Sequence, residues 1–148
     1  MREQDSHTME RPIGEYRVLL VDDQILVRRM LREILEGYPG VSVVAEAANG
    51  VEAVALAAAI KPDVVLMDVN MPLMNGIEAT KRIKQVLTSP VVIGLSINTC
   101  TEVAERMKEA GADAFLSKED GSQHLYNVLT QLVDVRLPLR SLTPNAIL

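Results

Sequence analysis

The sequence of 148 residues has one cysteine, no tryptophan and only 3% aromatic residues. A single cysteine, Cys100, excludes an internal disulfide, and we interpret it as a small apolar side chain in a reducing compartment. No apolar run is long enough to span a bilayer and no signal peptide is evident, so we expect a cytoplasmic protein without membrane contact. A formal net charge of -5 argues against broad nucleic-acid binding.

Hydrophobic residues make up 48% of the chain, so the scarcity of aromatics predicts a core of aliphatic side chains. The length is typical of one domain with a substantial core. Residues 1–16 are polar and irregular, which predicts a loose N-terminal tail. We expect the domain to span residues 17–133, and residues 134–148 to be a linker, a tail or the start of an output domain.

Apolar runs and amphipathic segments alternate along the chain. Unalternating apolar runs predict buried strands at 17–21, 41–45, 64–68, 91–95 and 114–116. Helical periodicity predicts helices at 24–36, 49–58, 77–87, 101–110 and 122–133. This alternation predicts an α/β fold, a doubly wound parallel sheet of five strands with five helices on its two faces.

The spacing of apolar residues also predicts which side of each helix faces the sheet. The first helix has an apolar stripe of Val27, Met30, Leu31 and Ile34, and the third is expected to point Ile83, Val86 and Leu87 inward. The second helix runs through Val51, Val54, Ala55 and Ala58. Asn49 is expected to cap the second helix.

Polar side chains stand where the predicted strands end. Asp22 and Asp23 follow the first strand, Asp68 closes the third, Ser96 closes the fourth and Lys118 follows the fifth. The carboxyl ends of parallel strands lie along one edge, where open α/β sheets bind ligands. Clustered carboxylates repel one another unless a cation such as Mg²⁺ joins them. The set therefore predicts a site for Mg²⁺ and a phosphoryl group.

Each of these residues also has a simpler interpretation. The two adjacent acids could cap the first helix, Ser96 could be a turn residue and Lys118 a solvated surface lysine. Their joint occurrence at successive strand ends favours the site. The chain lacks a P-loop sequence and a glycine-rich turn after the first strand, which argues against nucleotide sites of those types. His7 and His124 stand apart from acidic clusters, and we interpret both as surface residues.

Between about Arg17 and Val133 the sequence resembles the receiver domain of bacterial two-component response regulators. The matching segments are Val18-Leu19-Leu20-Val21-Asp22-Asp23, Lys61-Pro62-Asp63-Val64-Val65-Leu66-Met67-Asp68, Met71-Pro72-Leu73-Met74-Asn75-Gly76, Ser96, and Phe115-Leu116-Ser117-Lys118. The resemblance implies a flavodoxin-like (β/α)5 fold with strand order 2-1-3-4-5.

The resemblance also implies roles for individual residues. Asp68 would accept a phosphoryl group from a histidine of a sensor kinase. Asp23, Asp68 and the backbone carbonyl of Asn70 would bind Mg²⁺ directly, and Asp22 would bind it through water. Lys118 would pair with the bound phosphoryl group.

The same resemblance implies a conformational switch. Ser96 would hydrogen-bond the phosphoryl group, and Phe115 would change rotamer in response, although Phe115 could also be a plain core aromatic. The switch would alter a surface made by the fourth helix, fifth strand and fifth helix. On phosphorylation a homodimer could form there, or through the first and fifth helices. We expect the regulated output to be transcription.

Two departures from the family pattern matter. Ile97 stands after Ser96, where the family usually has a small residue, and its bulk predicts slower phosphoryl exchange or hydrolysis. Glu119 stands where many members have proline, as in the subclass with a helix-turn-helix output domain. Residues 141–144, with the sequence Ser-Leu-Thr-Pro, resemble the start of that output domain. We expect no nucleic-acid contact from this chain itself.

Two other functions remain open on the sequence alone. An aspartyl-phosphate phosphatase would also have a nucleophilic Asp after a buried strand, but it would carry a second acid where this chain has Asn70. A phosphorylation-independent docking module would not need the complete acid cluster. We therefore do not expect an enzyme beyond self-phosphorylation and self-dephosphorylation of Asp68.

Overall fold

The computed structural model describes residues 15–97, 101–119 and 122–136. The strands are β1 (Tyr16–Val21), β2 (Val41–Ala47), β3 (Val64–Asp68), β4 (Val91–Ser96) and β5 (Ala114–Ser117). The helices are α1 (Ile25–Glu36), α2 (Gly50–Ile60), α3 (Gly76–Val86), α4 (Thr101–Ala110) and α5 (Ser122–Arg136). The predicted alternation of strands and helices is confirmed. The strand β1 begins one residue earlier than expected, and α5 continues beyond Val133 to Arg136.

The strands form one parallel sheet in the order β2-β1-β3-β4-β5, which confirms the order implied by the resemblance. The strand β1 lies between β2 and β3, so the chain's winding reverses at β1 and β3. Ligands of open α/β sheets bind beyond the carboxyl ends of strands at such a reversal. The topology alone therefore marks the ends of β1 and β3 as the place for a site.

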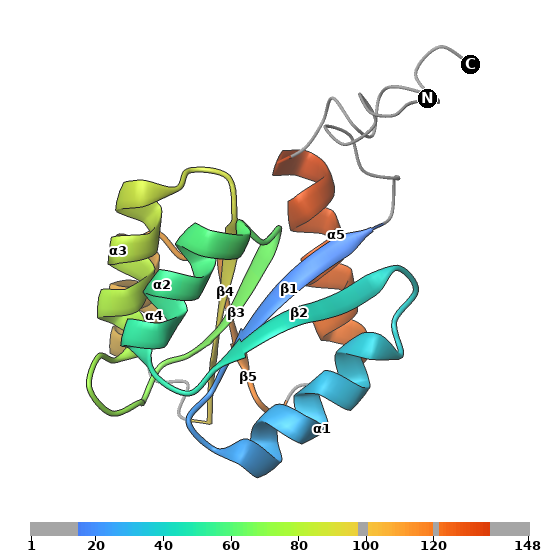
Figure 1. Ribbon diagram of the computed structural model, residues 1–148, viewed down its shortest axis with the longest axis horizontal. Coiled ribbons are helices and arrows are strands. Elements are labelled where there is room, and N and C mark those ends of the chain that lie inside the picture. Colours follow the sequence, from blue (N-terminus) through green and yellow to red (C-terminus); the bar gives the residue numbers. More distant parts are fainter. Residues whose placement is uncertain (1–14, 98–100, 120–121, 137–148) are drawn as a thin grey trace.

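Helices cover both faces of the sheet. Figure 1 shows α1 and α5 on one side and α2, α3 and α4 on the other. Successive residues of a strand point to opposite faces, so Leu20 and Leu66 pack in the layer beneath α1 and α5. Leu19 and Met67 pack in the layer beneath the other three helices. All five residues of β3 are buried, which explains why its sequence is uninterrupted by polar residues until Asp68.

Burial of the helices corrects part of the predicted inward faces. In α1 the buried residues are Leu31 and Leu35, whereas Met30 is 52% exposed and was wrongly placed inward. Positions four residues apart stay on one face of a helix, so the actual stripe runs from Val27 through Leu31 to Leu35.

The face predicted for α3 was also partly wrong, and α2 buries residues that its sequence does not mark. The helix α2 buries Ala53 and Ala57, while Val51 is exposed. The segment is apolar on nearly every side, so its periodicity does not mark a face. In α3 Ile83 is buried as predicted, but Val86 is exposed at the helix end.

Asparagine residues are the N-caps of two helices. Asn49 accepts a hydrogen bond from the Glu52 N–H at 2.9 Å, which confirms the predicted cap of α2. Asn75 does the same for α3 with the Glu78 N–H, a cap that the sequence analysis did not identify. Such caps stabilise a helix by about 1 kcal/mol. None of the helices in the described part of the chain has the length and hydropathy needed to cross a bilayer.

Candidate functional site

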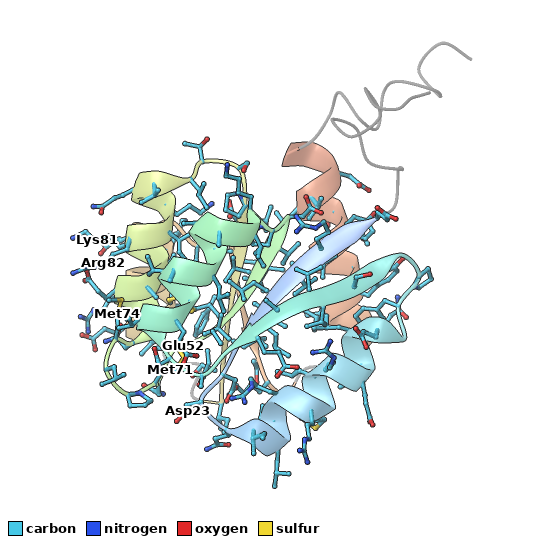
Figure 2. The ribbon with its side chains drawn as sticks, in the orientation of Figure 1. Asp23, Glu52, Met71, Met74, Lys81 and Arg82 are labelled. Carbon is cyan, nitrogen blue, oxygen red and sulfur yellow. The ribbon has the colours of Figure 1, made fainter. Side chains whose placement is uncertain are left out.

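Three carboxylates meet at the carboxyl ends of β1 and β3. Asp22 and Asp23 follow β1, Asp68 is the last residue of β3, and one oxygen from each lies within 4.8 Å of the others. Asp22 and Asp68 are buried, whereas Asp23 is exposed. Figure 2 labels Asp23 at this edge of the sheet. The structure thus brings together the three acids that the sequence analysis selected.

Lys118 joins this cluster from the end of β5. Its Nζ atom lies 2.7 Å from Asp22 Oδ2 and 3.2 Å from Asp68 Oδ1, and its side chain is 14% exposed. The solvated surface position considered for Lys118 is therefore wrong. Burial would lower the pKa of Lys118, but the hydrogen bond that Lys118 donates to Asp22 and the charge of Asp68 outweigh it and raise that pKa. The amine remains a cation at neutral pH.

The carboxyl group of Asp68 has a strongly altered acidity. Burial raises its pKa from 3.8 to about 6, and the negative charge of Asp22 adds to this, while Lys118 opposes it. Burial and the neighbouring acids together therefore outweigh the effect of Lys118 on this pKa. A second cation in the cluster would stabilise the ionised form of Asp68.

Both carboxylate oxygens of Asp22 accept hydrogen bonds. Its Oδ1 atom accepts a hydrogen bond from the Gln24 N–H at 2.9 Å, and its Oδ2 atom accepts from Lys118. The first bond fits the capping role that had been considered, because α1 has no side-chain cap at Gln24. The second bond belongs to the site, so the two interpretations of Asp22 are compatible.

Ser96 and Asn70 lie beside the acids on neighbouring segments. Ser96 ends β4 and is buried, and its carbonyl accepts a hydrogen bond from the Lys118 N–H at 3.0 Å. This bond ties the ends of β4 and β5 together. Asn70 is exposed in the loop after β3. Lys118 therefore contacts the acids directly. Ser96 ends the strand that pairs with β3, and Asn70 follows Asp68 in the chain.

Close backbone packing shapes the loop after β3. A Cβ atom on Gly76 would lie 2.1 Å from the carbonyl oxygen of Asp68, so only glycine fits there. The Gly76 N–H donates to Val69 O at 2.8 Å, which folds the loop back over the end of β3. Gly50 is packed as closely against Met74, and its N–H donates to the Met74 carbonyl at 3.1 Å. The starts of α2 and α3 therefore hold this loop on both sides.

Phe115 lies on β5, opposite Gly94 of β4 in the parallel register. It is partly buried in the core layer that includes Met107 of α4. A Cβ atom on Gly94 would meet Met107 Cε at 2.7 Å and Phe115 Cδ1 at 2.9 Å, so the ring occupies space that Gly94 leaves open. The sequence analysis identified Phe115 but not the glycine beneath it.

The other polar residues singled out in the sequence lie elsewhere or cannot be placed. His124 is exposed on α5, as expected for a surface residue. His7 and Cys100, like residues 1–14 and 137–148 of the expected tails, lie outside the described residues.

Fold and site together define a doubly wound α/β protein with carboxylates and a lysine at the switch point of its sheet. The chain belongs to the response regulator receiver domain family, whose sequence model matches residues 18–130. The prediction of this family from sequence is confirmed.

Curated relatives carry the same domain with different outputs. The chain is 39% identical over 132 residues to protein-glutamate methylesterase/protein-glutamine glutaminase 1 of Methanosarcina acetivorans, covering 87% of this chain and 37% of that protein. It is 40% identical over 112 residues to response regulator UvrY of Escherichia coli O6:H1, covering 76% of this chain and 51% of that protein. The chain thus spans between a third and a half of these relatives.

Solved structures of response regulators have the same fold. A two-component response regulator of the LuxR family from Aurantimonas sp. SI85-9A1 has a TM-score of 0.79 at 34% identity, covering 82% of this chain and 87% of that chain. The CheX-CheY-BeF3-Mg+2 complex from Borrelia burgdorferi has a TM-score of 0.74 at 25% identity, covering 79% of this chain and 88% of that chain. This chain is therefore a receiver domain of two-component signalling.

Proposed function

We propose that Asp68 is the phosphoacceptor of this receiver domain and takes a phosphoryl group from a histidine of a sensor kinase. The observation that carries the proposal is the position of Asp68, which shares its cluster with two acids and with the Lys118 amine at 3.2 Å. An Asp68 oxygen forms a bond to phosphorus while the bond between phosphorus and the donor nitrogen breaks. The donor imidazole keeps that electron pair and takes up a proton.

The donor set fits Mg²⁺. Asp23, Asp68 and the Asn70 carbonyl would hold the ion directly, because hard oxygen ligands suit it. Both oxygens of Asp22 already accept hydrogen bonds from Gln24 and Lys118, which supports an indirect role for Asp22 through water. The raised pKa of Asp68 supports the presence of a second cation in the working site. When bound, Mg²⁺ neutralises charge on the phosphoryl oxygens.

Protein side chains would supply the remaining contacts. Lys118 would move part of its pairing from Asp68 to the phosphoryl oxygens, since its Nζ already lies against the reacting carboxylate. Ser96, buried at the end of β4, would donate its hydroxyl to the same group. Phe115 would then turn inward as Ser96 is drawn to the phosphoryl group. The ring already packs in the core layer that includes Met107 of α4, so its movement would be transmitted to that helix.

The switched surface would comprise α4, β5 and α5, because Phe115 lies on β5 and contacts α4 through Met107. A homodimer could use this surface, or one made by α1 and α5. We propose transcription regulation in the cytoplasm as the output, in a longer regulator with a helix-turn-helix domain. The LuxR-family structure and UvrY support this output, whereas other relatives are methylesterases. That other domain would contact DNA. The receiver domain itself would contact neither nucleic acid nor a membrane.

The test is phosphorylation by a small phosphodonor. The protein is incubated with Mg²⁺ and acetyl phosphate and then weighed by intact mass spectrometry. We expect the parent to gain the mass of one phosphoryl group, and Asp68→Ala to gain none. Chelation of Mg²⁺ should abolish the gain, and Asp63→Asn, which removes a buried acid at the other end of β3, should retain it. A parent that gains no mass, or an Asp68→Ala variant that gains as much, would contradict the proposal.

A further inference from the structure

We propose that Arg28 is a positioning residue that holds the turn between β1 and α1 and thereby sets the affinity of the acidic site for Mg²⁺. The inference rests on the proposed function. The turn carries Asp22 and Asp23, two of the three carboxylates. Neither Arg28 nor its partner Glu46 stands out in the sequence, because both look like surface charges.

Arg28 connects the turn to the edge strand of the sheet. Its Nη1 atom donates to the backbone carbonyl of Asp22 at 2.7 Å, and its Nε atom donates to Glu46 Oε1 on β2 at 2.9 Å. The side chain is only 15% exposed. One guanidinium group therefore donates hydrogen bonds both to the backbone between the two acids and to Glu46 on β2.

Glu46 is itself held in place. Glu46 also pairs with Arg32, whose Nη2 donates to the Val43 carbonyl at 3.2 Å. Burial would raise the pKa of Glu46, but its hydrogen bonds to Arg32 and Arg28 lower it overall. Glu46 therefore remains an anion at neutral pH and holds Arg28 continuously.

Hydrogen bonds on the other side of Asp22 complete the arrangement. The Asp22 N–H donates to the Ala47 carbonyl of β2 at 3.1 Å, and the Arg28 N–H donates to the Gln24 carbonyl at 3.0 Å. Both the N–H and the carbonyl of Asp22 are thus tied to β2, one directly and one through Arg28. Loss of the guanidinium would release the carbonyl side and let the carboxylates of the turn reorient.

The position of Arg28 in its helix argues against a purely stabilising role. Arg28 lies in the first turn of α1, where the helix dipole disfavours a cation, and that turn contains no acidic residue. The cation nevertheless points back to the carbonyl of Asp22. Groups that hold metal ligands in place commonly change metal affinity by about 10- to 100-fold when removed.

The experiment is a Mg²⁺ titration of the full chain, in which the NMR chemical shifts of the backbone amides of the turn report binding. The variants are Arg28→Ala, Arg28→Lys and Glu46→Gln, and the matched control is Arg29→Ala. Arg29 is exposed and carries the same charge one position away. We expect Arg28→Ala to raise the Kd for Mg²⁺ about tenfold. Arg29→Ala should stay within about twofold of the parent because an exposed charge is screened. Arg28→Lys should regain part of the affinity, since an amine can donate to the Asp22 carbonyl.

A second measurement needs no metal. Hydrogen exchange of the Asp22 amide, relative to that of Leu66 in β3, should be faster in Arg28→Ala than in Arg29→Ala. A uniformly destabilised protein would speed both amides equally. If Arg28→Ala does not fold, Glu46→Gln decides, with a Kd above that of Arg29→Ala expected.

The inference about Arg28 would be overturned if Arg28→Ala bound Mg²⁺ with the same affinity as Arg29→Ala. If Arg28→Ala does not fold, equal affinities of Glu46→Gln and Arg29→Ala would overturn it. A parent that binds no Mg²⁺ would instead overturn the proposed function. The exchange measurement would still test whether Arg28 holds the turn.

Discussion

Replacement of Asp68 by asparagine should stabilise the metal-free protein, and by an amount that depends on pH. The Asp68 carboxyl ionises near 3.8 in an unfolded chain, but burial and Asp22 raise its pKa to about 6 in the folded protein. Between these values the folded state holds a proton that the unfolded state has lost. Stability contributed by this group therefore falls as pH rises from 4 to 6, and it stays low at higher pH.

The size of the effect follows from the same two values. A change of about 1.4 kcal/mol accompanies each pKa unit, so ionised Asp68 costs the metal-free fold about 3 kcal/mol above pH 6. Asparagine carries no charge and avoids this cost. Lys118 keeps its 2.7 Å contact with Asp22 in the variant, so little stability is lost there. We expect the difference in free energy of unfolding to grow from near zero at pH 4 to about 2–3 kcal/mol at pH 7.5.

The assay is urea unfolding with chelator present, at several pH values between 4 and 7.5. Unfolding is monitored by circular dichroism, because the chain has no tryptophan whose fluorescence could report it. Glu33→Gln, at an exposed position of α1, removes one negative charge and is the control; its difference from the parent should stay within about 0.5 kcal/mol at every pH. Addition of Mg²⁺ at pH 7.5 should stabilise the parent more than Asp68→Asn. A difference that is constant with pH, or an asparagine variant less stable than the parent at pH 7.5, would refute the argument.

Three further substitutions test packing and access around the site. Gly76→Ala should destabilise the fold by about 3 kcal/mol or more, since its Cβ would meet backbone, whereas Gly94→Ala should cost only about 1 kcal/mol because mobile side-chain atoms can yield; equal costs in urea unfolding would refute this. Thr80→Val should stabilise by about 1 kcal/mol, because the buried Thr80 hydroxyl has no hydrogen-bond partner among the described residues; unchanged or lower stability would count against it. Ile97→Ala should lose its phosphoryl group faster than the parent in a mass-spectrometric time course, because replacing the large exposed side chain after Ser96 by a small one would widen the approach to Asp68; equal or slower decay would show that its bulk does not matter.

The sequence by itself determined the order of the elements and selected the residues of the candidate site. Buried strands such as 64–68 are unbroken apolar runs, because a parallel strand covered on both faces has no solvent side. A charged residue is costly inside such a run, so polar residues collect where strands end, and this pattern revealed Asp68, Ser96 and Lys118.

Only the tertiary structure decided which helix faces are buried and what supports the site. The helix α2 is apolar on nearly every side, so its choice of Ala53 over Val51 depends on the neighbouring elements. Arg28 and Glu46 are 18 residues apart, and nothing local distinguishes them from solvated charges. Gly76 must be glycine only because the chain returns to the carbonyl of Asp68. Such contacts arise from the way distant segments are packed together, and their distances are not encoded in any local pattern.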